Sequence, residues 1–321
     1  MTSRTMPPTD VLVIGEALGD IVDDGSVTEH VGGSPANVAL GLGRRGLDVA
    51  LLTQIGRDTR GSRIARHLER SGVRLLDESF SDHATSTATA TVAADGSADY
   101  RFDVQWRLSP APLPVSPTVV HTGSIAAFLE PGRHSVLAHI DRLRPPVVTF
   151  DPNIRADLLG SHPEALNCFR ESAARADLVK MSDEDAAWIY PSMAPDEVAR
   201  AVGNLGPRLV VITRGARGAT LTTATSEVHL PSVKTPVADT IGAGDTYMAS
   251  LILDLLTLRG HPLDVDTVAR MGERAAQAAA ITVSRPGADL PWAHELAGPE
   301  VSPPSPEDLD LGLRYLPGQR R

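Results

Sequence analysis

The sequence of 321 residues has very little cysteine and few aromatic residues. Cys168 is the single cysteine, so an intrachain disulfide and a cysteine-rich metal site are both excluded. Aromatic residues make up only 4% of the chain. We expect Trp106 and Trp188 to serve packing rather than to form stacking platforms for nucleic-acid bases.

Positive charge is also scarce. The chain carries 30 Lys and Arg against 40 Asp and Glu, a net charge of −10. This balance argues against nucleic acid or an anionic membrane as a general partner. The opening MTSRTMPPTD lacks the apolar core of a signal peptide, and no apolar run reaches membrane-spanning length. We therefore expect a cytoplasmic protein with no nucleic-acid or membrane partner.

Several common catalytic signatures are missing from the sequence. It contains no G-x-x-x-x-G-K-[ST] loop, no G-x-S-x-G elbow and no H-E-x-x-H helix, and its ten histidines show no metal spacing. GLGRRG at 41–46 satisfies G-x-G-x-x-G, but it closes a predicted helix and precedes a strand. The dinucleotide fingerprint needs the opposite order, so a dehydrogenase is disfavoured.

Short apolar runs instead alternate with helical patterns along the chain. Hydrophobic residues make up 42% of it, enough for a sizeable core. Because the apolar runs are continuous, the alternation predicts an α/β fold: three layers, with a mainly parallel sheet between two layers of helices. The predicted strands are 11–15, 49–56, 118–124, 147–151, 177–182 and 208–213, and the predicted helices are 35–46, 59–72, 243–258 and 265–284.

One segment departs from this alternation. Residues 85–108 alternate small or apolar residues with polar ones around Asp95-Gly96, the pattern of a β-hairpin. With a companion excursion at 17–31, they predict a small β-sheet lid on a main domain spanning 10–297. Residues 1–9 are expected to form a disordered tail, and the Pro-rich, charged residues 298–321 a C-terminal surface extension.

The most informative motif is DTIGAGD at 239–245, which runs into an apolar helical pattern. Gly242, Ala243 and Gly244 occupy a predicted first turn, where backbone N–H groups lack partners and the helix dipole is positive. Small residues let an anion approach these donors closely. Asp245 adds a carboxylate beside them, which suits a base that takes a proton from a hydroxyl attacking a phosphate. A Gly-rich turn before a core helix is the structural alternative.

A second motif, HVGGSPANVA at 30–39, suits a polar ligand. Gly32 and Gly33 permit close backbone approach, and Asn37 can both donate and accept hydrogen bonds. Asp20 follows the first strand, and ligands of open α/β sheets bind beyond the carboxyl ends of the strands. These residues therefore form a candidate sugar-hydroxyl cluster. A tight strand-to-helix turn and an exposed loop acid are the plain alternatives.

Polar segments follow three further strands at the same edge. DPNIR at 151–155 contributes Arg155, which could offset charge on a transferring phosphoryl group, although Pro152 also suits a simple capped turn. KMSDED at 180–185 brings carboxylates that could hold a hydrated Mg²⁺, with Asp183 read as a helix cap. In VVITRGARGATL at 210–221, a nucleotide border and an ordinary hairpin turn are both possible, and the turn is favoured.

The ordered co-occurrence of these motifs resembles the ribokinase-type (PfkB) carbohydrate kinase family over roughly residues 10–290. The resemblance implies a ribokinase-like α/β domain with a β lid, and ATP with Mg²⁺ as the phosphoryl donor. It leaves open a monovalent cation such as K⁺ and a homodimer formed through the lid.

The resemblance and the residue patterns described above together predict roles for individual residues. The catalytic residues would be Asp245 as general base, Gly242, Ala243 and Gly244 as anion hole, and Arg155 as charge partner. The sugar would be bound by Asp20, Gly32, Gly33 and Asn37. The nucleotide would be bound by Lys180, Thr213, Gly215 and Gly218, and the metal would be held through water by Asp185 and Ser182.

The identity of the substrate is a finer question. GEALGD, GGSPANVA and DPNIR look closest to fructokinases, which implies fructose or a related ketose or hexose. A ketodeoxygluconate kinase, a ribokinase and a nucleoside kinase of the same family are alternatives. A non-catalytic sugar or nucleotide sensor on the same fold is a further alternative, although a sensor would not need Asp245.

Overall fold

A computed structural model describes residues 8–92, 98–258 and 261–296. Within these ranges, the central feature is a nine-stranded sheet of order β15-β14-β13-β12-β11-β10-β1-β4-β6. All neighbours pair in parallel except β13 with β14 and β14 with β15. The strands are β1 (Pro8–Ile14), β4 (Val49–Leu52), β6 (Val73–Leu75), β10 (Ser116–Gly123), β11 (Val147–Asp151), β12 (Leu178–Ser182), β13 (Leu209–Thr213), β14 (Ala219–Thr222) and β15 (Glu227–Leu230).

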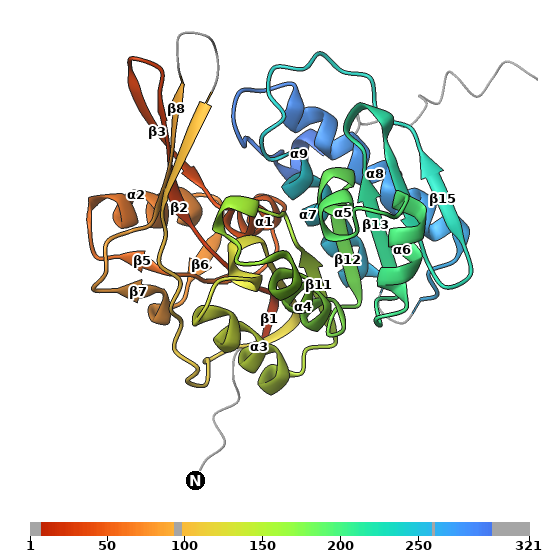
Figure 1. Cartoon of the computed structure of the whole chain (residues 1–321), viewed down its shortest axis with the longest axis horizontal. Helices are drawn as coiled ribbons and strands as arrows, with labels where there is room; N and C mark the ends of the chain where they lie inside the picture. Colours follow the sequence, from red (N-terminus) through yellow and green to blue (C-terminus); the bar gives the residue numbers. More distant parts are fainter. Residues whose placement is uncertain (1–7, 93–97, 259–260, 297–321) are drawn as a thin grey trace, which may run out of the picture.

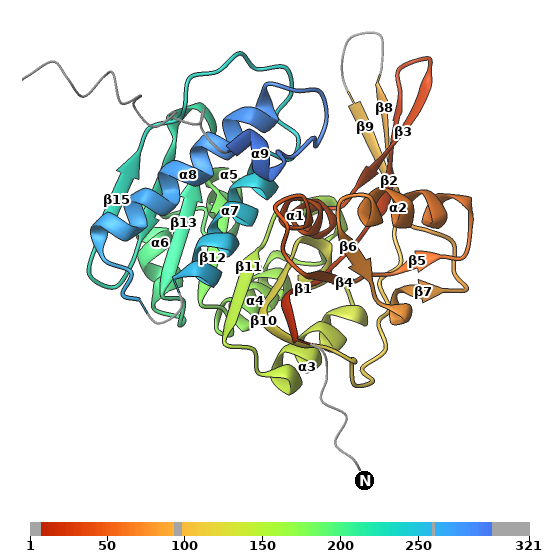
Figure 2. The ribbon, with the colours of Figure 1, turned by 180° about the vertical axis from the view of Figure 1, so that it is seen from behind.

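Helices cover both faces of this sheet, as predicted. One face carries α3 (Gly132–Leu143), α4 (His162–Ala173), α5 (Asp183–Ile189) and α6 (Pro195–Gly203) (Figure 1). The other face carries α1 (Ser34–Gly43), α2 (Thr59–Glu69), α7 (Ala243–Thr257) and α8 (Val265–Val283) (Figure 2). Each helical layer closes its own apolar core, one around Leu40, Leu251 and Met271 and the other around Trp106, Phe150 and Phe169. The shorter helices are η1 (Asp77–Ser79), η2 (Ser124–Ala127), η3 (Ala156–Leu158), η4 (Gly215–Arg217) and α9 (Ala293–Leu296).

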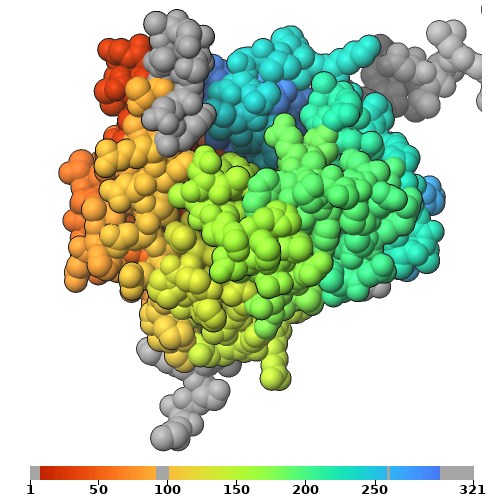
Figure 3. Space-filling model, viewed as in Figure 1, coloured from red at the N-terminus to blue at the C-terminus, as the bar shows by residue number. Residues whose placement is uncertain are grey.

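A separate four-stranded sheet, the lid sheet, rises from the end of the molecule where the parallel strands finish (Figure 1). In the described part of the chain its order is β3-β2-β8-β9, with β2 parallel to β8 and the outer pairs antiparallel. Figure 3 shows it from outside as a red and orange column above the main body. Its strands are β2 (Leu18–Asp23), β3 (Val27–Gly32), β8 (Thr87–Val92) and β9 (Ala98–Asp103).

Three sequence-based expectations need comment. The strand expected over 49–56 is interrupted, because Thr53 N–H binds Ser79 Oγ (3.1 Å) and the chain then forms β5 (Ile55–Gly56) against β7 (Phe80–Ser81) in a separate small sheet. Residues 8 and 9, expected in the N-terminal tail, belong to β1. The extension at 298–321 lies outside the described residues.

None of the described helices combines the length and the hydrophobicity that a membrane span requires.

The helices of the main domain differ in how they begin. Helices α2 and α8 each begin with a side-chain cap: Asp58 accepts from Gly61 N–H, and Asp264 accepts from Thr267 N–H. Helix α7 begins instead at Gly242, which has no side-chain cap hydrogen bond. This bare helix start marks the candidate site.

Candidate active site

Asp245 lies in the first turn of α7 and is only 8% exposed. Both of its carboxylate oxygens accept hydrogen bonds from α1: Ser34 Oγ donates to Oδ1 (2.6 Å) and Asn37 Nδ2 donates to Oδ2 (2.8 Å). Ser34 and Asn37 are three residues apart on a helix, so their side chains share one face. The structure therefore holds the predicted base in one fixed orientation.

The sequence interpretation did not identify Ser34, which stands within the quoted GGSPAN motif. It did identify Asn37, but as a sugar ligand; in the structure its amide donor is directed at Asp245. The segment starts α1 because Gly33 adopts φ 104°, a left-handed conformation that favours glycine, and Pro35 follows in the first turn. A Cβ on Gly33 would also lie 2.4 Å from the Glu16 carbonyl oxygen.

The turn before Asp245 has free backbone donors. Gly242 adopts φ 79°, and Ala243 N–H is donated weakly to the Thr240 carbonyl (3.3 Å). Among the residues that the structure describes, the N–H groups of Gly244 and Asp245 have no hydrogen-bond partner. Unpaired donors at a helix start attract anions, and the helix dipole adds to the attraction.

A buried cation lies against the same turn. A Cβ built on Gly244 would be 3.0 Å from Lys180 Nζ, so glycine gives the ammonium direct access to the helix start. Lys180 Nζ forms an ion pair with Asp151 Oδ2 (2.5 Å), and the two side chains are 5% and 2% exposed. Burial lowers the pKa of Lys180, but the carboxylates of Asp151, Asp245 and Asp185 together outweigh this effect and the net shift is upward. Lys180 therefore stays charged beside the free donors.

Asp185 and Ser182 shape the neighbouring turn. They form a capping box at the start of α5, in which Ser182 N–H donates to Asp185 Oδ2 (3.0 Å) and Asp185 N–H donates to Ser182 Oγ (3.0 Å). Asp185 Oδ1 also accepts from Ile154 N–H (2.8 Å). Each carboxylate oxygen of Asp185 keeps one further lone pair. This capacity fits a contact to Mg²⁺ through a bridging water, but not a set of ligands that coordinates the ion directly. Their metal role stays a prediction.

Arg155 projects from the loop after β11. It is exposed, and its Nη1 donates to Asn153 Oδ1 (2.9 Å) and to the Ile154 carbonyl (3.0 Å). Burial raises the pKa of both Asp20 and Asp245, and the positive charge of Arg155 opposes the shift in each. Arg155 therefore faces the acidic groups of the site, as a charge partner for a phosphoryl group would.

Asp20 lies on β2 of the lid sheet, and its carboxylate accepts no hydrogen bond within the described ranges. A Cβ on Gly32 would lie 1.9 Å from Asp20 Oδ2, so glycine at this position leaves room for the carboxylate. Burial raises the pKa of Asp20 to about 6, and Arg155 and His30 oppose the shift. A half-buried carboxylate with free acceptor capacity suits a sugar hydroxyl.

Glu16, which the sequence interpretation passed over, is another buried acid at this edge. It follows β1, is 4% exposed, and accepts a hydrogen bond from Ala126 N–H (3.3 Å). Burial raises its pKa to about 7, against the lowering effects of Ser124 and Ala126. Its place between Gly15 and Asp20, directly after a predicted strand, was the available sequence signal.

The predicted nucleotide segment follows β13. Thr213 is paired with Ser182 across the two strands, and its Oγ1 donates to the Met181 carbonyl (3.3 Å). Gly215 adopts φ 52° and a Cβ there would meet open space. Gly218 adopts φ 86° and a Cβ there would lie 1.9 Å from the Leu230 carbonyl, so this glycine serves the hairpin itself. Thr213 and Gly215 remain candidates for nucleotide contact, whereas Gly218 has a structural reason to be glycine.

Comparison with known proteins relates this geometry to a family. The pattern of the pfkB family carbohydrate kinase matches residues 9–295. The fructokinase of Klebsiella pneumoniae is 31% identical over 261 residues, which cover 76% of this chain and 84% of that relative.

Solved structures are similar over most of their length. A fructokinase variant of Vibrio cholerae O395, bound to fructose, ADP and potassium ion, has a TM-score of 0.76 at 26% identity, covering 89% of this chain and 95% of the other. The aminoimidazole riboside kinase of Salmonella enterica has a TM-score of 0.75 at 26% identity, covering 89% and 97%. These neighbours confirm the predicted ribokinase-like fold. The chain belongs to the pfkB family of carbohydrate kinases and is an enzyme of the ATP-dependent sugar kinase type.

Proposed function

We propose that this kinase phosphorylates a hydroxyl group of fructose or a closely related ketose, with Asp245 as the general base. The observation that carries the proposal is the Asp245 carboxylate, buried and oriented by Ser34 and Asn37 directly beside free helix-start donors and Lys180. A carboxylate in this position can accept a proton and is shielded from water.

In the proposed reaction, Asp245 takes the proton of the sugar hydroxyl as its oxygen bonds to the γ-phosphorus of ATP. The bond from that phosphorus to the β–γ bridging oxygen breaks, and ADP leaves. The N–H groups of Gly244 and Asp245, with Lys180, stabilise the negative charge on the transferring group, and Arg155 adds charge from the opposite loop. Mg²⁺ would neutralise phosphate charge, held through water by Asp185 and Ser182.

The sugar would lie between Asp245 and the lid sheet, where Asp20, Gly32 and Gly33 line the approach. We assign Asp20 to a sugar hydroxyl because its carboxylate has free acceptor capacity. Closure of the lid would exclude water, which competes with the sugar for the γ-phosphoryl group. A homodimer formed through the lid, a potassium requirement and a cytoplasmic location without nucleic-acid or membrane partners stay predictions.

Fructose is favoured by the fructokinase relative and by the neighbour that binds fructose. A riboside is the second candidate, because an aminoimidazole riboside kinase is equally similar in fold. Ketodeoxygluconate and ribose complete the set within the family.

The test is to incubate the protein with ATP, Mg²⁺ and, separately, fructose, ribose, ketodeoxygluconate, other hexoses and a panel of ribosides. ADP release would be measured with and without added K⁺. We expect kcat/KM for fructose to exceed that for every riboside. The reverse order would replace fructose by a riboside, and sugar binding without ADP release on the whole panel would instead support a non-catalytic sensor.

A further inference from the structure

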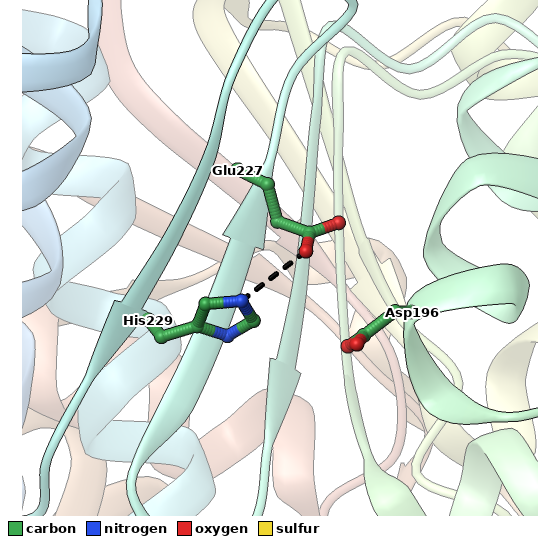
Figure 4. A group of neighbouring side chains, drawn as sticks. All are labelled: Asp196, Glu227 and His229. Atoms are coloured by element: carbon green, nitrogen blue, oxygen red, sulfur yellow. Dashed lines mark ion pairs between the residues drawn. The ribbon is translucent and has the colours of Figure 1, made fainter.

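A group of metal-ligating side chains lies on the sheet face covered by α6, on a part of the molecule that the catalytic site does not use. Glu227 and His229 project from β15, and Asp196 reaches toward them from the first turn of α6 (Figure 4). One ligand atom from each lies within 4.8 Å of the others. His229 Nε2 and Glu227 Oε1 lie 3.2 Å apart.

Two oxygens around this group are buried without a partner among the described residues. Asp196 Oδ1 is one of them, a carboxylate oxygen with no donor. The other is Thr222 Oγ1; Thr222 is only 7% exposed and is paired with Glu227 across β14 and β15, so both side chains lie on the same face. A buried acceptor without a donor costs free energy, and a bound cation with its water ligand would satisfy both oxygens.

The contacts of the His229 ring orient its Nε2 toward Glu227. Its Nδ1 lies 3.0 Å from Thr220 Oγ1, and Arg214 Nη2 donates to that same hydroxyl. Arg214 Nη2 also lies 3.3 Å from Nδ1 itself. When Nδ1 carries the ring proton and donates it to Thr220 Oγ1, the Nε2 lone pair is directed at Glu227. In that tautomer the Nε2 lone pair and the Glu227 carboxylate face each other, and a cation bound between them would stabilise the pair. Outer hydrogen bonds of this kind orient metal-binding histidines.

We propose that Asp196, Glu227 and His229 form a zinc site, with water as the fourth ligand near Thr222. One imidazole and two carboxylates suit Zn²⁺, which binds nitrogen and oxygen ligands at about 2.0–2.2 Å in a tetrahedron. The three ligand atoms lie within 4.8 Å of one another and would move closer together around the ion. Arg200 contacts the outer oxygen of Glu227 (3.3 Å) and is largely exposed, so Oε1 stays available for the metal.

The proposed zinc ion would stabilise the fold rather than take part in catalysis. Strand β15 is the edge of the nine-stranded sheet, and α6 packs on the same face. A metal joining Glu227 and His229 to Asp196 would fasten this edge strand to the helix layer. Edge strands expose unpaired backbone groups, and natural proteins protect them in several ways. Sequence spacing gave no sign of the site, because Asp196 is far from β15 along the chain.

The test is a zinc titration of the full-length protein after chelator treatment, without nucleotide, against a competing chromophoric zinc indicator. We expect one zinc ion per chain at micromolar affinity or tighter, unaffected by excess Mg²⁺. Asp196→Asn and His229→Ala should each weaken zinc binding by at least about tenfold. Zinc should also raise the melting temperature of the wild type but not of His229→Ala.

His134→Ala is the matched control, because His134 also pairs with a carboxylate, Glu130, but has no third ligand among the residues that the structure describes. This variant should bind zinc like the wild type. Circular dichroism checks that each variant is folded. If His229→Ala does not fold, the more conservative Asp196→Asn provides the test of zinc binding. Absence of stoichiometric zinc binding in the wild type would overturn the proposal. Equal zinc affinity in the wild type and in a folded Asp196→Asn would do the same.

Discussion

Ser34 Oγ donates a 2.6 Å hydrogen bond to Asp245 Oδ1, joining two residues 211 positions apart in the chain. The contact connects the first turn of α1 with the first turn of α7, so one sequence motif supports the proposed base supplied by the other. Asn37 completes the support from the same helix. The two motifs therefore form one unit, and its parts can be tested separately.

Ser34→Ala should lower kcat and shift its pH dependence. Burial raises the pKa of Asp245, and the hydrogen bonds from Ser34 and Asn37 oppose that shift. Removing the Ser34 bond should raise the pKa further, and a base works only when ionised. The acidic limb of the kcat–pH profile should therefore move to higher pH. Ser62→Ala, which changes an exposed serine of α2, is the control. If the acidic limb of Ser34→Ala lies at the same pH as that of the wild type, Ser34 serves only packing.

Asp245→Asn should reduce kcat by about 10²–10⁴-fold, because general-base catalysis typically contributes that much. The amide keeps the shape of the side chain, so ATP and sugar should still bind. Kinetics would be combined with calorimetric titration of both ligands. Asp266→Asn, which removes an exposed first-turn carboxylate from α8, should leave kcat unchanged. A loss below tenfold in Asp245→Asn would rule out the base assignment.

Asp20→Ala should raise the KM for sugar much more than the KM for ATP. A hydrogen bond to a charged group contributes on the order of 1.5–3 kcal/mol, equivalent to roughly 10–150-fold in affinity. Asp24→Ala is the matched control, because Asp24 is exposed in the turn that follows β2 and bonds only to Ser26 among the described residues. Equal effects of Asp20→Ala on both substrates would point to a general folding defect instead.

Asp151→Asn should destabilise the fold by about 3–5 kcal/mol, because it leaves Lys180 buried without its counter-charge. Lys180 is one of two lysines in the chain. Asp141→Asn breaks a largely exposed pair with Arg175 and should cost about 0–1 kcal/mol. Urea unfolding at neutral pH measures both. Similar losses in the two variants would mean that water reaches the Asp151–Lys180 pair.

Glu16→Gln should flatten the dependence of stability on pH. Because burial raises the pKa of Glu16 from 4.5 to about 7, the folded state holds a proton that the unfolded state releases. The wild type should therefore lose stability as pH rises from about 4.5 to 7, by about 3 kcal/mol from this group. Gln has no group that ionises, so the stability of Glu16→Gln relative to the wild type should increase over that pH range. Parallel curves for wild type and variant would show that Glu16 ionises normally.

Local patterns along the sequence were sufficient for the fold and for part of the proposed site. Alternating apolar runs and helical periods gave the parallel sheet and its two helical layers, because these depend on neighbours within a few residues. DTIGAGD likewise located Asp245 in a helix start, since glycine, small residues and an acid in that order constrain the backbone directly. Alternating residues around Asp95-Gly96 predicted the hairpin at 85–108, and 17–31 was expected as a companion excursion; the structure places β8 and β9 in the first segment and β2 and β3 in the second.

Only the tertiary structure decided which side chains meet. Ser34 bonds to Asp245 because α1 and α7 pack side by side, and no spacing within either motif encodes that distance. Glu16 accepts a hydrogen bond from Ala126 of η2, more than a hundred residues later in the chain, and the burial that raises its pKa exists only in the folded protein. Asp196 likewise lies within 4.8 Å of His229 only because α6 packs on the face of the sheet from which His229 projects. Side-chain contacts and desolvation depend on how distant segments pack, so the sequence determined the elements and the tertiary structure determined the chemistry between them.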